Sequence, residues 1–180
     1  MRQLTRRELL AFAAAAAATP LLARTTRAQE RAAGASPLAP PVHSLLESSP
    51  FVYICPLRAD GHESACHGEV WFAWLDGNVV VITAHDRWKA RSLAAGLDRA
   101  RVWVGDHGTW KTLTGRSDAF RSAPSFDARG RLVKDPATLA RLLAAYEKKY
   151  PAEIGRWRER FEKGFASGER VLIAYAPLPA

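Results

Sequence analysis

The sequence predicts a mainly β domain, α+β by content, in which an antiparallel barrel carries a few helices. Asp60-Gly61 and Asp76-Gly77 each stand between β-rich segments, as two-residue hairpin turns do. The segments beside the second pair are apolar on both faces, which suits a small closed barrel better than a one-sided sheet. The predicted order is strands, a short helix after the third strand, more strands, a helical pair and a last strand.

Residues 1–28 predict an export leader of the twin-arginine type. Arg6 and Arg7 precede a run from Leu9 to Leu22 that is nearly all Ala and Leu, and Thr26-Arg27-Ala28 has the small outer residues of a cleavage site. The alternative is a membrane anchor, but the run is shorter than the roughly 20 apolar residues that span a bilayer. We therefore expect a periplasmic or otherwise extracytoplasmic protein, with the twin-arginine translocase as its partner during export.

The charge of the chain does not indicate nucleic-acid binding. The net charge is +8, but residues 1–28 hold five Arg and one Glu, a balance of +4. The remainder also carries +4, with acidic and basic residues well mixed and no basic tract, so we expect no nucleic-acid partner. Residues 29–42, rich in Ala, Pro, Gly and Ser, predict a linker, and residues 43–180 have the length of one domain.

The two cysteines fall in the first predicted hairpin. With Asp60-Gly61 as its turn, the numbers of opposed residues sum to 121, so Cys55 faces Cys66. Opposed Cα atoms in an antiparallel pair are close enough for a disulfide. The alternative is a pair of reduced thiols.

The second hairpin joins predicted strands 69–75 and 78–84. Its opposed residues sum to 153, which pairs Trp74 with Val79, Phe72 with Val81 and Val70 with Thr83. A short helix follows, with Asp86 as N-cap and Gly96 at its end, and then a strand over 101–105.

The rest of the chain predicts a further strand, a helical pair and a closing strand. The further strand is expected near residues 110–114, and Asp135-Pro136 is typical of a helix start. Two helical apolar stripes follow, made of Leu139, Leu142, Leu143, Tyr146 and Tyr150 and then of Ile154, Trp157, Phe161 and Phe165. Residues 170–175 form the last strand. We expect Trp71, Trp74, Trp103 and Trp157 in the core, and Trp88 and Trp110 nearer a ligand pocket.

The junction from Ile82 to Arg91 is the best candidate site. A strand ends and a helix begins there, so free backbone N–H groups and the helix dipole could bind an anion. Lys89 adds a charge, Thr83 a hydroxyl, and Arg87 and Arg91 guanidinium groups that suit phosphate. The alternative is a capped surface helix with solvated basic side chains, and an N-cap at Asp86 would compete with an anion.

The same segment resembles the pyridoxamine-phosphate oxidase superfamily of flavin-binding split barrels. The resemblance covers about residues 45–115 and is carried by Val-Val-Ile-Thr after the Asp-Gly turn, Trp-Lys-Ala-Arg at the helix start, and Arg-Val-Trp-Val. It implies a split barrel that binds FMN at a homodimer interface. It also implies that Thr83 and Lys89 hold the flavin phosphate, with Trp88 beside them and with Ile82 and Ala84 near the ring.

Two departures from that family weaken the prediction of its reaction. Trp88 stands where the oxidase has an arginine, and no arginine stands near Cys66-His67-Gly68, so we do not expect vitamin oxidase activity. Related branches bind a deazaflavin or haem, and for haem His67, His85 and His107 are the candidate axial ligands. No zinc-like spacing and no ordered Ser-His-Asp set is present, so we name no metal site and no catalytic residue.

The sequence thus supports two hypotheses of function. The first is an exported flavin protein that carries out small-molecule oxidoreduction or electron transfer, in which the flavin supplies the chemistry. The alternative is a non-catalytic binding protein for haem, a deazaflavin or another anionic ligand on the same scaffold.

Overall fold

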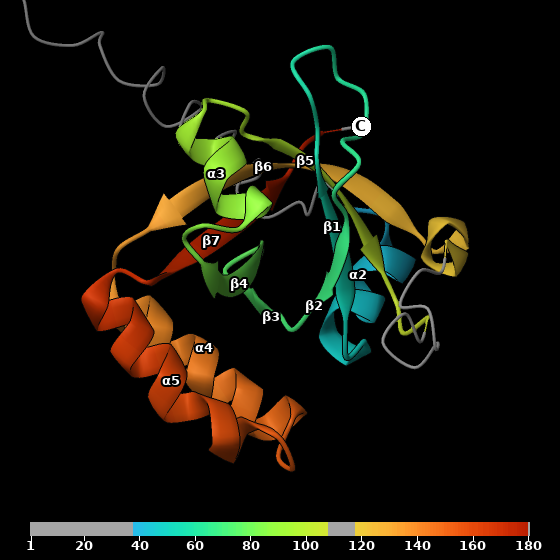
Figure 1. The fold of residues 1–180 in the computed structure, drawn as a ribbon. Coiled ribbons are helices and arrows are strands. Elements are labelled where there is room, and N and C mark those ends of the chain that lie inside the picture. The colour runs from blue at the N-terminus through green and yellow to red at the C-terminus, as the bar shows by residue number, and fades with distance from the viewer. Residues whose placement is uncertain (1–37, 108–117, 180) are drawn as a thin grey trace, which may run out of the picture. The chain divides into compact units, whose positions relative to one another are not determined.

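A computed structural model describes residues 38–107 and 118–179, and its strands form one antiparallel sheet that curls into a half-barrel (Figure 1). The order of strands in the sheet is β2-β1-β5-β6-β7-β4-β3. This confirms the predicted mainly β split barrel. In chain order the elements are α2 (Pro40–Ser48), β1 (Val52–Pro56), β2 (Gly68–Val70), β3 (Ala73–Leu75), β4 (Asn78–Ala84), α3 (Trp88–Ala94), β5 (Arg99–Val104), the 3-10 helix η2 (Ala119–Ser122), β6 (Ser125–Val133), α4 (Pro136–Lys149), α5 (Ile154–Ser167) and β7 (Arg170–Pro177).

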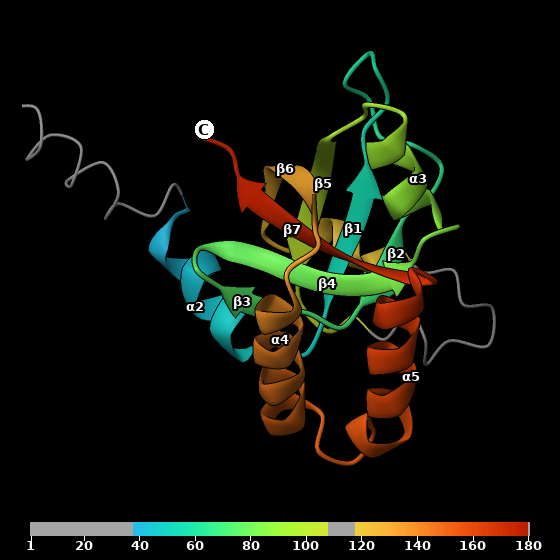
Figure 2. The same cartoon turned by 90° about the vertical axis from the view of Figure 1, so that its left-hand side faces the viewer.

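Both faces of the central strands are covered, as the apolar sequence of the second hairpin predicts. Val79 and Val81 of β4 point into the curled sheet, and Val80 points outward against the helical pair. The inner core also holds Val52, Ile54, Val102, Val104, Ala128, Ile173 and Tyr175. Helices α4 and α5 lie side by side against β3, β4 and β7 (Figure 2). The alternation of inward and outward residues therefore builds two apolar cores on one sheet.

The barrel is split between β2 and β4, because the predicted strand 69–75 is in fact two strands. Residues 68–70 pair with β1, and residues 73–75 pair with β4, so Trp71 and Phe72 carry the chain across the split. Trp74 pairs with Val79 as predicted. The predicted pairing of Phe72 and Val70 with β4 is wrong, because pairing with β4 covers only residues 73–75 and Val70 pairs with Val52 of β1.

Helix α4 begins as predicted, and the residue at its C-terminal end forms hydrogen bonds with two segments beside the split. The side chain of Asp135 accepts hydrogen bonds from the backbone N–H groups of Ala137 (3.1 Å) and Thr138 (3.0 Å). At the other end the Tyr150 hydroxyl accepts from the N–H of Phe72 (3.2 Å) and donates to the carbonyl of Pro50 (2.6 Å). One side chain thus ties α4 to the segments before β1 and before β3.

The register of the first hairpin differs from the prediction. Ile54 pairs with Gly68, whereas Leu57 bridges to Glu63 nearer the turn, so the second arm contains two extra residues. Cys55 is buried opposite Arg101 of β5, and Cys66 is exposed in the bulged arm. The predicted facing of Cys55 and Cys66 is therefore wrong, and both are free thiols.

Several element boundaries also differ from the sequence analysis. Helix α2 begins at Pro40, inside the range 29–42 predicted as a linker. Helix α3 has Arg87 rather than Asp86 at its N-cap, and no side chain caps it. Strand β6 was not predicted, and the predicted strand 110–114 and leader 1–28 lie outside the described residues. Within the described part of the chain, none of the helices has the length and apolar character needed to cross a membrane.

Candidate functional site

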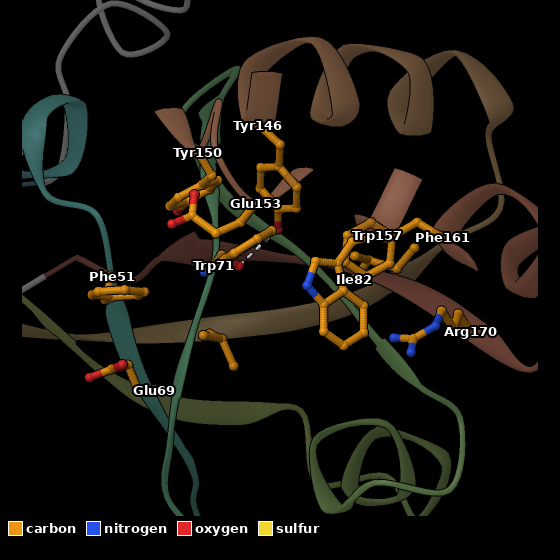
Figure 3. Close-up of a pocket in the computed structure, with 11 residues that line it drawn as sticks. Phe51, Glu69, Trp71, Ile82, Tyr146, Tyr150, Glu153, Trp157, Phe161 and Arg170 are labelled. Carbon is orange, nitrogen blue, oxygen red and sulfur yellow. Dashed lines mark hydrogen bonds between the residues drawn. The ribbon is translucent and has the colours of Figure 1, made fainter. Parts of the chain in front are cut away.

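A pocket of about 610 Å³ opens at the split between β2 and β4, beneath α4 and α5 (Figure 3). We call it the seam pocket. Its lining residues are Phe51, Glu69, Val70, Trp71, Ile82, Tyr146, Tyr150, Glu153, Trp157, Phe161 and Arg170. This volume and this mainly aromatic lining are typical of small-molecule and cofactor sites.

The aromatic walls of the seam pocket are fixed by stacking. Trp71 stacks on Tyr150 with 4.3 Å between ring centroids and 9° between planes. Trp157 stacks on Phe161 at 5.9 Å and 19°. Such rings offer flat, rigid surfaces to a planar ligand at little entropic cost.

The hydroxyl of Tyr146 bridges the split at the back of the seam pocket. It donates to the carbonyl of Trp71 (2.8 Å), and the backbone N–H of Ile82 interacts with the same oxygen. Burial raises the pKa of Tyr146 well above its usual value, so the group stays a neutral phenol. A side-chain hydroxyl therefore takes the place of direct pairing between the two strand edges.

The charged residues of the seam pocket lie at two ends. Figure 3 shows Glu69 and Glu153 toward one end and Arg170 toward the other. Glu69 is buried and accepts a hydrogen bond from the hydroxyl of Tyr53. Burial lowers the pKa of Arg170, and its guanidinium lies over the ring of Phe161, 5.2 Å from the centroid.

The predicted site residues on β4 divide between the two faces of the sheet. Ile82 lines the seam pocket. Ala84 lies on the same face as Ile82, because side chains alternate along a strand, and it pairs with Arg170. Thr83 pairs with Val171 on the opposite face, which is that of the inner core.

The side chain of Lys89, in the first turn of α3, is partly buried rather than extended into solvent. A Cβ atom added to Gly68 would lie 3.1 Å from its Nζ, so the ammonium group rests against the backbone of β2. Burial lowers the pKa of Lys89, which the nearby thiols of Cys66 and Cys55 partly oppose. None of the carboxylates in residues 38–107 and 118–179 pairs with it. Lys89 is thus a half-buried cation without a counter-ion among the described residues.

The other predicted anchors are dispersed. Trp88 donates its indole N–H to the hydroxyl of Ser64 (3.2 Å) and so packs on the bulged arm. Arg87 and Arg91 are exposed, and Arg87 lies 3.9 Å from Asp86. Trp110 lies outside the described residues. The structure therefore brings Ile82 to the pocket and leaves Arg87 and Arg91 in solvent.

Sequence reasoning missed most of the seam pocket. Trp71 and Trp157 were predicted to be core, yet both line the pocket, and Trp157 is 37% exposed. Arg170 was seen only as the first residue of a strand. The pocket joins β2, β4, α4, α5 and β7, so only knowledge of the strand pairing could have gathered these residues.

Comparisons with known proteins support the fold. No family model matches the chain, and no curated protein matches it. Three solved structures that it resembles are HutZ, the haem storage protein from Vibrio cholerae (14% identity, 79% of this chain and 92% of that chain, TM-score 0.52), the conserved hypothetical protein Rv2991 from Mycobacterium tuberculosis (18%, 78% and 81%, 0.54) and Campylobacter jejuni ChuZ (9%, 89% and 63%, 0.51). The fold is the split barrel of the superfamily that the sequence resembles.

The donor set of the seam pocket fits a flavin better than a haem. Its stacked aromatic walls suit a planar ring. Half-buried Lys89 does not line the pocket; it lies beside Gly68 of β2, where it is a cation available to a phosphate. A haem needs an axial ligand such as His, Cys, Met or Tyr. Tyr146 and Tyr150 are the only such residues in the described lining, and both hydroxyls are already bonded to backbone groups. The candidate axial ligands point elsewhere: His67 packs on Phe120, His107 packs on Tyr53, and His85 is exposed.

Proposed function

We propose that this protein is an exported split-barrel protein that binds a flavin, with FMN as the expected form, and uses it for small-molecule oxidoreduction or electron transfer. The observation that carries this proposal is the seam pocket. Its walls are stacked aromatic rings, and it is also lined by Ile82 of β4, which the resemblance to flavin-binding proteins places near the flavin ring. A bound flavin would supply hydride or single-electron transfer.

The chain's own residues would bind and shield such a cofactor. Trp71 and Ile82 would contact the ring, and the aromatic rings of α4 and α5 would keep water away from it. Thr83 and Lys89 are the proposed phosphate ligands, because Lys89 is a desolvated cation that lacks an ion pair within the described residues. A phosphate bound there would stabilise the charged form of Lys89, which burial disfavours.

The proposed location and assembly follow from the sequence. Export by the twin-arginine route moves a folded protein, so a cofactor can be inserted before export. Nicotinamide donors are expected inside the cell, so a periplasmic flavoprotein would take electrons from another donor or a partner protein. A homodimer is proposed from the family resemblance, and light scattering of the purified protein measures it directly.

The second candidate is a non-catalytic haem-binding protein, favoured by the likeness to the haem storage protein HutZ. It predicts a different spectrum. Protein purified from its own host should show flavin absorbance under the first proposal and a Soret band under the second. Mass spectrometry of the released ligand separates FMN from a deazaflavin.

The flavin proposal is tested by the affinities of FMN and riboflavin, which differ only in the phosphate. Lys89→Ala should weaken FMN binding about ten- to hundredfold and leave riboflavin binding unchanged, since one charge-assisted contact is lost. Lys148→Ala removes an exposed lysine from α4 and serves as the matched control. A wild-type protein that binds neither flavin would refute the proposal, and equal losses of both ligands would refute the role of Lys89.

A further inference from the structure

Arg170 enters the seam pocket along a path that a glycine keeps open. A Cβ atom added to Gly164 of α5 would lie 2.9 Å from both Cγ and Cδ of Arg170. Glycine in the middle of a helix is less favourable than alanine, yet here it lets the arginine stem pass between α5 and β7. Figure 3 shows the guanidinium group directed toward the centre of the pocket.

The guanidinium of Arg170 has unused hydrogen-bonding capacity. It lies over the ring of Phe161, and none of the described carboxylates forms an ion pair with it. Arg101, another half-buried arginine, shows the usual arrangement: it bonds Asp127 (2.9 Å) and Glu63 (3.3 Å). Guanidinium donors bind carboxylate and phosphate oxygens two at a time. An aromatic pocket that ends in an arginine with no ion pair among the described residues therefore suits an aromatic anion.

Arg170 and the proposed cofactor anchors lie on opposite faces of the sheet. Arg170 pairs with Ala84, so these two side chains share the face of Ile82 and the pocket. Thr83 and its partner Val171 share the opposite face. The end of β4 therefore offers two separate positions for negative charge.

We propose that Arg170 binds the carboxylate or phosphate of the second ligand of the seam pocket, and that the substrate class is a small aromatic acid. This inference rests on the proposed function, in which a flavin occupies the same pocket. The acid would lie with its anionic end at Arg170 and its ring among the aromatic walls. Glu69 and Glu153 at the far end would repel the opposite orientation.

The test uses benzoate and its neutral analogue benzamide as probes. Binding to the purified protein is followed by tryptophan fluorescence and calorimetry, first without and then with FMN. The wild type should bind benzoate at least about tenfold more tightly than benzamide, since a charge-assisted contact is worth about that factor. Arg170→Met should abolish this preference.

Two further variants test whether the position of the Arg170 guanidinium matters, and not only the presence of a positive charge. Gly164→Ala keeps the arginine and favours the helix, but its new methyl group must displace the Arg170 side chain, so the benzoate preference should again fall. Arg156→Met removes an exposed charge from the same helix that does not line the pocket, and it should keep the preference. Thermal unfolding confirms that each variant is folded.

Each outcome decides between the two proposals. A wild type without the benzoate preference, or an Arg170→Met variant that keeps it, overturns the role of Arg170. Loss of the preference for FMN over riboflavin in Arg170→Met also overturns it, because the arginine would then hold the cofactor. If neither flavin binds the wild type while benzoate is still preferred, the flavin proposal fails and the aromatic-acid site stands.

Discussion

Two buried tyrosines should respond in opposite ways to the loss of a hydroxyl group. In Tyr150 the hydroxyl bonds the backbone N–H of Phe72 and the carbonyl of Pro50. In Tyr175 it is buried inside the half-barrel and has no hydrogen-bond partner within the described part of the chain. The same substitution, Tyr→Phe, therefore removes a satisfied group in one case and an unsatisfied one in the other.

The magnitudes follow from what each substitution leaves behind. Tyr150→Phe leaves the N–H of fully buried Phe72 unpaired, a loss of about 1–3 kcal/mol, and removes the bond to Pro50, worth about 1 kcal/mol more. We expect the free energy of unfolding to fall by about 2–4 kcal/mol. Tyr175→Phe removes a buried hydroxyl whose desolvation is uncompensated, so that free energy should stay level or rise by up to about 2 kcal/mol.

Urea unfolding followed by tryptophan fluorescence measures both effects. Tyr150→Phe should lower the midpoint, and Tyr175→Phe should leave it level or raise it. An unchanged denaturant slope would show that stability rather than compactness has changed. If Tyr175→Phe destabilises the protein as much as Tyr150→Phe, the distinction between the bonded and the orphaned hydroxyl is wrong. Binding of FMN to Tyr175→Phe should be unaltered, since Tyr175 does not line the seam pocket.

Three further predictions test other parts of the structure. Burial lowers the pKa of Lys149 to about 8, against about 10.4 when unfolded, so the unfolded chain binds more protons between these values. The free energy of unfolding should rise over that pH range, and Lys149→Met should flatten the rise in urea unfolding at pH 7.5, 9 and 10. Asp135→Ala should lower stability by about 1 kcal/mol through loss of the α4 cap, measured against Asp86→Ala, which removes an exposed aspartate. A chromogenic disulfide reagent should modify exposed Cys66 quickly. It should modify Cys55 only on unfolding, because Cys55 is buried and burial raises the pKa of its thiol. If neither cysteine reacts in the native or the denatured protein, the two form a disulfide.

Local chemistry made much of the fold predictable from sequence. Asp76 and Gly77 adopt φ values of 51° and 72°, the positive angles that a two-residue hairpin turn requires. Asp135 caps α4 as its position before a proline predicts. These features depend on a few neighbouring residues, so no knowledge of the rest of the chain is needed.

Errors arose where distant strands decide the outcome. The bulge after Glu63 moves Cys66 out of register with Cys55, and nothing in the local sequence marks it. Strand β6 carries Asp127, Arg129 and Arg131 on one face, a pattern that resembles a solvated loop. It is a strand because β5 and β7 pair with it on both sides.

The site was predictable only as far as it lies on one segment. Ile82 was identified from the end of β4, but Arg170 and the stacked rings reach it from elements far along the chain. Gly164 shows the difficulty most clearly. Before the structure it is only a glycine near a helix end, and its role depends on the path of an arginine in another element.

The seam pocket exists because one hydroxyl keeps two strand edges apart. In a continuous sheet the N–H of Ile82 and the carbonyl of Trp71 are the kinds of groups that would bond each other directly. Here the hydroxyl of Tyr146 lies between them, donating to the carbonyl and meeting the N–H. Both backbone groups are satisfied without closing the barrel, so the split carries no penalty for buried unpaired groups at this point. The opening is therefore built into α4 rather than into the strands, and the same helix also supplies Tyr146 and, at its C-cap, Tyr150 to the pocket lining.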